Sequence, residues 1–432
     1  MSTEVDVAIV GGGPSGAAAA HYLASRGHSV LVCEKKSFPR EKTCGDGLTP
    51  RAVKVLEEMG LGDELRTWER VQGLRVHAAG RTLELPFPEL EDFRNFGLVK
   101  PRKELDQVVL DNAEAAGAKV LYKTQVHEPV FDRGVLAGFV AKRASDGLGH
   151  RAGTSVEEER VTAKWTVCAE GAATKFARSL GRERNLDYPM GLAIRQYFKS
   201  PMQSSGWFEA YLDVRSGPRG GLGRTPGKGD NLPGYGWVFP VGDGTVNAGV
   251  GVLSTFGGWR DINLHDLQRN FVSNLPEEWE VNYDTVCSKP RAGRLFMGQS
   301  VWPPHGPGFL LTGDAAGMIN PCNGEGIAYA YETGRIAARH IDEALRVGSS
   351  PTLGGYTDEL KETYGPYFRL GRRFVKLIGH PVLMEKLVSL GMHSKTVMSF
   401  ALTLLANLED SRAHNAEQKG LKALLKLAEW KP

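Results

Sequence analysis

The chain has 432 residues, a net charge of +3 and 24% charged residues. This length predicts two or three domains, and so balanced a charge argues against a nucleic-acid-binding protein, which concentrates basic residues on one face. The five cysteines form no CxxC pair, so neither a metal site nor a disulfide framework is expected.

The N-terminal segment carries Glu4 and Asp6 directly before a short apolar run, which leaves no room for a signal peptide. No stretch approaches the ~18 uncharged apolar residues of a membrane span. We therefore expect a cytoplasmic protein, and peripheral contact with the inner face of the membrane stays open.

Residues 5–10 (VDVAIV) predict a buried strand. A glycine turn, an Ala-rich helix that ends at Gly27 and a second strand over 28–35 follow it. These elements make a complete βαβ unit.

The glycine turn of this unit has the GxGxxG spacing, formed by Gly11, Gly13 and Gly16. Such glycines let the backbone approach a pyrophosphate, whose charge lies at the helix N-terminus. Glu34, at the end of the second strand, can accept hydrogen bonds from ribose hydroxyls. The motif predicts a dinucleotide cofactor and does not separate FAD from NAD.

Further segments that are typical of a nucleotide-binding domain occur later in the chain. An amphipathic helix is predicted over 103–116, and strand-to-glycine-turn patterns occur at 159–172 and 306–319. Residues 183–290 alternate aromatic and β-branched side chains, as expected for an inserted sheet. Within them, residues 215–234 are rich in glycine and proline and predict a loop over or beside a site.

Two later signals favour FAD. Arg102 lies at the predicted start of the helix over 103–116, and Asp314 follows a strand within the stretch 312–326. Asp314 can hydrogen-bond a ribityl chain, and the glycines of this stretch let backbone N–H groups approach an isoalloxazine or a phosphate. So dense a glycine turn is costly without a ligand. For Arg102, a solvated charge at a helix start remains the alternative.

Four segments together resemble the flavoprotein group that contains para-hydroxybenzoate hydroxylase: GGGPSG with Glu34, PRKELD, CAEGAATKFAR and GDAAGMINPCNGEG. The resemblance spans residues 5–345 and implies a non-covalent, extended FAD with its ring between the nucleotide domain and the inserted sheet. One departure is Glu170-Gly171, where the group usually has Asp-Gly. The implied cofactor-binding residues are Gly11, Gly13, Pro14, Ser15, Gly16, Glu34, Lys35, Cys44, Gly45, Arg102, Val126, Asp314, Pro321, Gly324, Gly326 and Ile327.

The implied fold class is α/β: a Rossmann-like FAD-binding domain with an inserted antiparallel sheet as substrate domain and a C-terminal helical segment. The expected FAD-binding domain is discontinuous and comprises residues 1–75, 100–182 and 290–345. The expected sheet domain comprises residues 76–99 and 183–289, and the helical region comprises residues 346–432.

Two further stretches, FPREKTCGDGLTPRAV (38–53) and PGYGWVFP (233–240), resemble the geranylgeranyl reductase branch of this group. That branch reduces isolated double bonds in prenyl chains of archaeal lipids, chlorophyll precursors or menaquinone, and the two stretches are most similar to its bacterial menaquinone type. The resemblance implies Cys44, Tyr235 and Trp237 as catalytic residues. It also implies an isoprenoid lipid substrate and an electron donor, either NAD(P)H or a ferredoxin-like protein.

Several alternatives stay open for these residues. Tyr235 and Trp237 point to one face of a strand and could simply pack there, and Cys44 could be a small buried residue. The proton donor could be Cys44, Tyr235 or water. Cys44 and Cys322 lie in two turns that should converge on the flavin, where they would either pair when oxidised or leave Cys44 to act alone.

Rival functions also stay open. An aromatic or polyketide monooxygenase, a halogenase and a non-enzymatic lipid carrier would all share the cofactor motifs. The C-terminal segment from about residue 355 is helical in pattern, Leu-rich and basic. It is typical either of a helical cap on the core or of a face that lies on a membrane surface.

Overall fold

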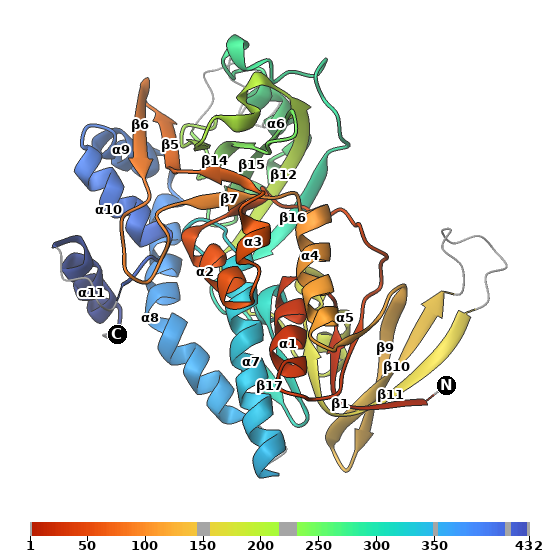
Figure 1. The fold of residues 1–432 in the computed structure, drawn as a ribbon. Coiled ribbons are helices and arrows are strands. Elements are labelled where there is room, and N and C mark those ends of the chain that lie inside the picture. The colour runs from red at the N-terminus through yellow and green to blue at the C-terminus, as the bar shows by residue number, and fades with distance from the viewer. Residues whose placement is uncertain (1, 145–155, 216–230, 349–352, 411–415, 430–432) are drawn as a thin grey trace.

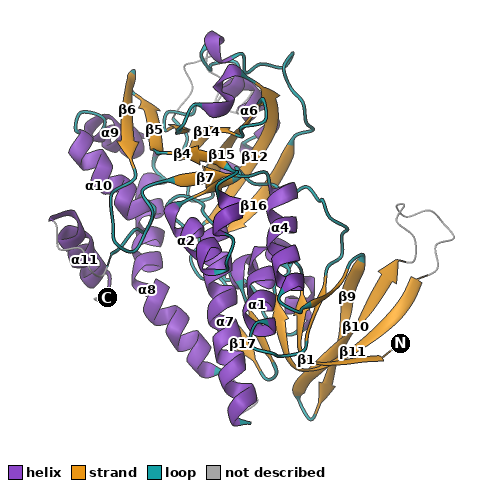
Figure 2. Cartoon of the chain, viewed as in Figure 1, coloured by secondary structure: helices purple, strands orange, loops and turns teal. Residues whose placement is uncertain are grey.

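The computed structural model describes residues 2–144, 156–215, 231–348, 353–410 and 416–429 (Figure 1). Most of the predicted loop over 215–234 lies outside these ranges. The predicted α/β class is confirmed, since two large sheets, a small sheet and a helical C-terminal region make up the described chain (Figure 2).

The first large sheet carries the βαβ unit. Its strands lie in the order β17-β18-β11-β1-β2-β8, and the hairpin of β9 and β10 joins it through β11. Neighbours from β18 to β8 are parallel. The strands are β1 (Ser2–Val10), β2 (Val30–Cys33), β8 (Lys119–Leu121), β9 (Thr124–Asp132), β10 (Val135–Ala144), β11 (Val156–Cys168), β17 (His305–Gly306) and β18 (Phe309–Leu311).

Helix α1 (Pro14–Ala24) packs against this sheet and against α4 (Arg102–Ala115) and α7 (Ile327–Val347). The close approach of α1 and α7 requires Gly334, because a Cβ there would lie 2.4 Å from the backbone oxygen of Ser15. Two sequence-distant glycine turns, before α1 and before α7, are thereby brought side by side.

The second large sheet is the inserted one, with strand order β16-β12-β15-β14-β13-β5-β6. Its pairs are antiparallel except β13 with β5. The strands are β5 (Gly73–Ala78), β6 (Arg81–Pro86), β12 (Met190–Lys199), β13 (Phe208–Tyr211), β14 (Gly234–Pro240), β15 (Thr245–Leu253) and β16 (Arg291–Phe296). The sheet therefore reaches a few residues beyond the boundaries expected at 76 and 289.

Smaller elements connect the two sheets. β3 (Gly47–Leu48), β7 (Gly97–Val99) and β4 (Glu69–Val71) form a three-stranded sheet. The remaining described helices before the C-terminal region are α2 (Pro50–Glu58), α3 (Gly62–Leu65), α5 (Lys175–Ser179) and α6 (Leu264–Val272).

The C-terminal region comprises α8 (Gly354–Ile378), α9 (Pro381–Gly391), α10 (Lys395–Leu405) and α11 (Ala416–Glu429). Buried polar contacts fasten it to the nucleotide domain: Arg51 pairs with Glu332 at 2.8 Å, and Tyr364 of α8 donates to the same carboxylate at 2.7 Å. Among the helices of the described residues, none is long and apolar enough to cross a membrane.

Candidate functional site

The first glycine turn is built for a close backbone approach. Gly11 donates its N–H to the Cys33 carbonyl at 2.9 Å, and a Cβ at position 16 would lie 1.9 Å from the oxygen of Gly11. Gly13 caps α1, and neither a side-chain cap nor an acidic residue occupies the first turn. The N–H groups of α1, which include those of Ser15 and Gly16, thus remain available to an anion.

Glu34 is held at the end of β2 with 4% exposure. Its two carboxylate oxygens each accept a backbone N–H at 2.9 Å, one from Gly12 and one from Lys36. Lone pairs remain for further donors such as ribose hydroxyls. Thr124 at the start of β9 donates to the Glu34 carbonyl, which brings the strand of Val126 to this corner, whereas Lys35 is exposed.

Cations gather beside the first turn. Arg102 forms a two-point ion pair with Asp106 at 2.6 and 2.9 Å, and Arg40 reaches the same carboxylate at 3.0 Å. Burial lowers the pKa of Lys42, whereas the carboxylates of Asp314 and Asp106 act in the opposite direction. The sequence analysis missed Arg40 and Lys42, although both lie in the quoted FPREK run.

The second glycine turn faces the first. A Cβ at Gly313 would lie 2.9 Å from the Oγ of Ser15, and one at Gly326 would lie 3.3 Å from Oδ1 of Asp314. Ile327 begins α7, and Gly326 provides no side-chain cap. A second free helix N-terminus is thereby placed beside a carboxylate.

This donor set fits FAD. Two uncapped helix N-termini and the cations suit a pyrophosphate and a polar ring edge, and Glu34 and Asp314 suit the hydroxyls of the ribose and the ribityl chain. The Nε of Arg40 lies 3.8 Å from Oε1 of Glu34, which is an ion pair beyond hydrogen-bonding distance, and it has no hydrogen-bond acceptor in the described chain. A donor is therefore left for a ligand.

Asp46 organises the turn that follows. It is fully buried, and its backbone is left-handed at φ 65°. Its carboxylate accepts from the Tyr197 hydroxyl at 2.5 Å, from Asn247 Nδ2 at 2.7 Å and from the Arg102 N–H at 3.1 Å. Burial raises the pKa of Asp46, and these three donors oppose the rise.

Cys44 is fixed by the same network. Its Sγ accepts the Asp46 N–H at 3.3 Å, and its carbonyl accepts from Asn247 at 2.9 Å. Burial raises the pKa of the Cys44 thiol, and Arg102 partly opposes the rise. The side chain is therefore a partly exposed, protonated thiol at neutral pH rather than a thiolate.

The aromatic strand β14 touches this turn directly. Trp237 donates Nε1–H to Asn247 at 3.0 Å, and a Cβ at Gly45 would lie 3.3 Å from that nitrogen. The Tyr235 ring lies 5.9 Å from the Trp237 ring, and its hydroxyl donates to the Asn323 carbonyl at 2.8 Å. The CGDG turn, the aromatic strand and the NPCNGEG turn are thus in one place.

The NPCNGEG turn contains two buried titratable groups, the thiol of Cys322 and the carboxyl group of Glu325. Cys322 packs its Sγ 2.9 Å from a Cβ position at Gly371, and burial raises the pKa of its thiol to about 12. Burial raises the pKa of Glu325 to about 7, while a hydrogen bond from Thr49 opposes the rise, and Glu325 Oε2 is buried without a donor in the described chain. Both Cys44 and Cys322 are free thiols here, so their pairing stays a prediction.

Comparison with known proteins agrees with these motifs. The FAD binding domain family matches residues 4–243, more than half of the chain. The menaquinone reductase of Mycolicibacterium smegmatis is 36% identical over 418 residues, which cover 94% of this chain and 93% of that protein. The chain belongs to the geranylgeranyl reductase family of FAD-binding proteins. The expected family and the FAD cofactor are therefore confirmed.

More distant members extend the comparison. A digeranylgeranylglycerophospholipid reductase of Methanocella arvoryzae is 28% identical over 369 residues, covering 84% of this chain and 85% of that one. The crystal structure of a geranylgeranyl bacteriochlorophyll reductase-like protein from Thermoplasma acidophilum has a TM-score of 0.75 at 24% identity and covers 98% of this chain and 100% of that chain. This geranylgeranyl reductase fold thus extends through the C-terminal helices.

Proposed function

We propose that the protein saturates an isolated double bond in the prenyl chain of an isoprenoid lipid, with a menaquinone tail as its substrate. The observation that carries the proposal is the contact of the CGDG turn with the YGWVFP strand through Asn247, which bonds both Cys44 and Trp237. The similarity to a menaquinone reductase across 94% of the chain supports the choice of tail.

Reduced FAD, when bound, supplies the hydride for such a reduction. The chain must orient the alkene, exclude water and deliver a proton. Cys44 and Tyr235 both keep their protons at neutral pH, since burial raises the pKa of each. The faces of Tyr235 and Trp237 would stabilise positive charge that builds on the tertiary carbon of the alkene.

A row of packed aromatic rings leads from Tyr235 towards α10. Neighbouring centroids are 5.9 Å apart from Tyr235 to Trp237, 6.3 Å on to Phe239, 4.5 Å on to Phe208 and 6.4 Å on to Phe87. Phe87 and Phe96 line a cavity of about 760 Å³ that also borders α10, and the cavity has polar walls as well, formed by Arg70, Gln72, Glu89, Asn95, Ser399 and Thr403. Burial of a tail along this row would contribute ~0.8 kcal/mol per methylene.

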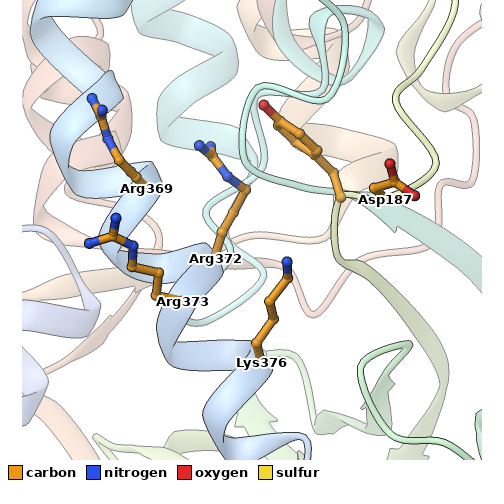
Figure 3. Close-up of a pocket in the computed structure, with 6 residues that line it drawn as sticks. Asp187, Arg369, Arg372, Arg373 and Lys376 are labelled. Carbon is orange, nitrogen blue, oxygen red and sulfur yellow. The ribbon is translucent and has the colours of Figure 1, made fainter. Parts of the chain in front are cut away.

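The cavity beside Phe87 is separate from Tyr235 and Trp237. Tyr235 and Trp237 line neither this cavity nor the smaller one beside α8 (Figure 3). Trp237 is 6% exposed and packs over Gly249, where a Cβ would lie 2.2 Å from the indole. The prediction that both rings line an apolar cavity at the flavin therefore remains a proposal.

The proposed peripheral membrane contact is supported by exposed apolar side chains of the C-terminal helices. Large apolar side chains are exposed at the end of α8 and on α9 and α10, namely Leu377, Val382, Leu387, Leu390 and Val397. Such a surface on short helices suits the interface of a bilayer rather than a span. A prenyl quinone could then enter beside α10 without leaving the membrane.

The test is an anaerobic one. The FAD-loaded protein is reduced with dithionite, incubated with menaquinone in detergent or vesicles, and the lipid is analysed by mass spectrometry. After the quinone ring has been reoxidised in air, we expect a gain of two hydrogens in the prenyl chain from turnover without oxygen, and a strong loss of that gain in Cys44→Ser. A product that carries oxygen, or a requirement for oxygen, would instead indicate a monooxygenase or halogenase, and an unchanged prenyl chain would indicate a carrier.

A further inference from the structure

An acid of the NPCNGEG turn lies beside the segment that carries Cys44. Helix α2 packs against α7, which brings the residues before α2 close to the turn before α7 (Figure 1). There the Thr49 hydroxyl donates to Oε1 of Glu325. Thr49 is the N-cap residue of α2, yet its side chain makes no capping hydrogen bond. Its hydroxyl instead joins Glu325 to the residues that follow the CGDG turn.

The same acid is tied to the aromatic strand. Its N–H donates to Asn323 Oδ1 at 2.9 Å, and the Asn323 carbonyl accepts from the Tyr235 hydroxyl at 2.8 Å. Burial raises the pKa of Tyr235 most, and the negative charges of the Cys44 thiolate and the Glu325 carboxylate raise it further. Glu325 is therefore within electrostatic reach of Tyr235 and one hydrogen bond from the segment of Cys44.

Burial decides how readily this acid loses its proton. It raises the pKa of Glu325 to about 7, while the Thr49 hydrogen bond and the charge of Arg51 oppose the rise. The charge of Glu332 adds to the rise, but Glu332 is paired with Arg51 at 2.8 Å, so each offsets part of the other's effect. Tyr329 of α7 stays neutral, since burial raises the pKa of its phenol. Glu325 is therefore present in both protonation states at neutral pH.

A proton on Glu325 is available to the site. Its Oε2 is buried and has no hydrogen-bond donor in the described chain, so this oxygen can carry the acidic hydrogen. Burial raises the pKa of Cys44 and that of Tyr235 above their ordinary values of 9.0 and 10.0. Either group would become a costly buried anion if it alone protonated the alkene. A proton from Glu325 in the same step would leave the charge on the group with the lowest pKa.

We propose that Glu325 supplies the proton that the alkene takes up, and that Cys44 or Tyr235 relays it. The inference rests on the proposed prenyl reduction and names the acid of that reaction. The π bond of the alkene is replaced by two C–H bonds, one formed with the hydride of reduced flavin and one with the proton of Cys44 or Tyr235. That group recovers a proton from Glu325, and solvent reprotonates the carboxylate. The alkene gains two hydrogens and FAD is left oxidised, so the step balances.

The test measures the initial rate of prenyl-chain saturation against pH. FAD-loaded protein reduced with dithionite is mixed with menaquinone without oxygen, and the product is determined by mass spectrometry after reoxidation in air. The wild-type rate should fall as pH rises through about 7, because Glu325 loses its proton there. Glu325→Gln should be about tenfold slower below that pH and lack the fall, since the amide still accepts from Thr49 but carries no acidic proton.

Two further variants separate proton supply from structure. Thr49→Val removes a hydrogen bond that lowers the pKa of Glu325, so the fall in rate should move to higher pH. Glu362→Gln, at an exposed position on α8, should keep the wild-type rate and pH profile. A purely structural role of Glu325 would change the rate by one factor at every pH and leave the profile in place.

Infrared difference spectra test the acid without turnover. The carbonyl band of a protonated carboxyl should disappear in wild type as pH rises through about 7, and this band should be absent from Glu325→Gln. A wild-type rate that does not fall with pH, the same fall in Glu325→Gln, or no such band overturns the inference. If the band is present but wild type saturates no prenyl chain at any pH, the proposed function fails, and the role of Glu325 in it fails too.

Discussion

Replacement of Asp46 by alanine should destabilise the protein through its hydrogen-bonding partners. The substitution leaves the Tyr197 hydroxyl, Asn247 Nδ2 and the Arg102 N–H without their acceptor. Each buried donor without an acceptor costs about 1–3 kcal/mol of stability. Removal of the buried carboxylate offsets part of this loss, because its desolvation penalty is also removed. We expect the free energy of unfolding to fall by about 4 kcal/mol, near the upper end for one substitution.

Urea unfolding of the FAD-loaded protein, followed by flavin and tryptophan fluorescence, measures this loss. A double-mutant cycle with Tyr197→Phe sharpens the test, because the phenylalanine removes one of the stranded donors. Tyr197→Phe should cost about 1 kcal/mol in wild type and less in Asp46→Ala. Strictly additive losses, or an Asp46→Ala protein as stable as wild type, would refute the network as described.

Three further outcomes follow from the site. Gly16→Ala should abolish FAD retention, because the new Cβ would lie 1.9 Å from Gly11's oxygen, while Gly62→Ala, whose Cβ meets nothing within 4 Å, should retain FAD on gel filtration. The pKa of Glu325 is raised to about 7 from 4.5, so the folded state favours the protonated acid. This group therefore contributes up to ~3 kcal/mol to the free energy of unfolding below pH 4.5, and the contribution is lost as pH rises through 7. Unfolding titrations of Glu325→Gln at several pH values should lack this loss, and a pH profile identical to that of wild type would contradict the assignment. Tyr235→Phe removes the hydrogen bond to the Asn323 carbonyl and should lower the free energy of unfolding by ~1 kcal/mol. The comparison is Tyr283→Phe at an exposed position, and equal losses in the two variants would show that the Tyr235 hydrogen bond does not stabilise the protein.

Local patterns were enough to predict the FAD cofactor and the elements that carry its candidate binding residues. The GxGxxG spacing, Glu34 at the end of β2 and the helix that starts at Arg102 each depend on neighbours within one supersecondary unit. Hydrophobic period and glycine placement specify such units directly. The C-terminal helices followed from the same kind of local signal.

The substrate half depends on pairs that no local pattern connects. Asp46 meets Tyr197 and Asn247, which lie 151 and 201 residues further along the chain. Which strand faces the CGDG turn is decided by the packing of the two sheets, and a single sequence does not contain that information.

The most direct test of the proposed function separates reduction of the tail from reduction of the quinone ring. Reduced flavin also reduces a quinone headgroup, and that change reverses in air. The measurement is therefore tandem mass spectrometry of menaquinone after anaerobic turnover and subsequent reoxidation in air. The account predicts two hydrogens that persist and map to the prenyl fragment, and that are absent with Cys44→Ser. A gain that disappears on reoxidation, or that maps to the ring, would contradict it.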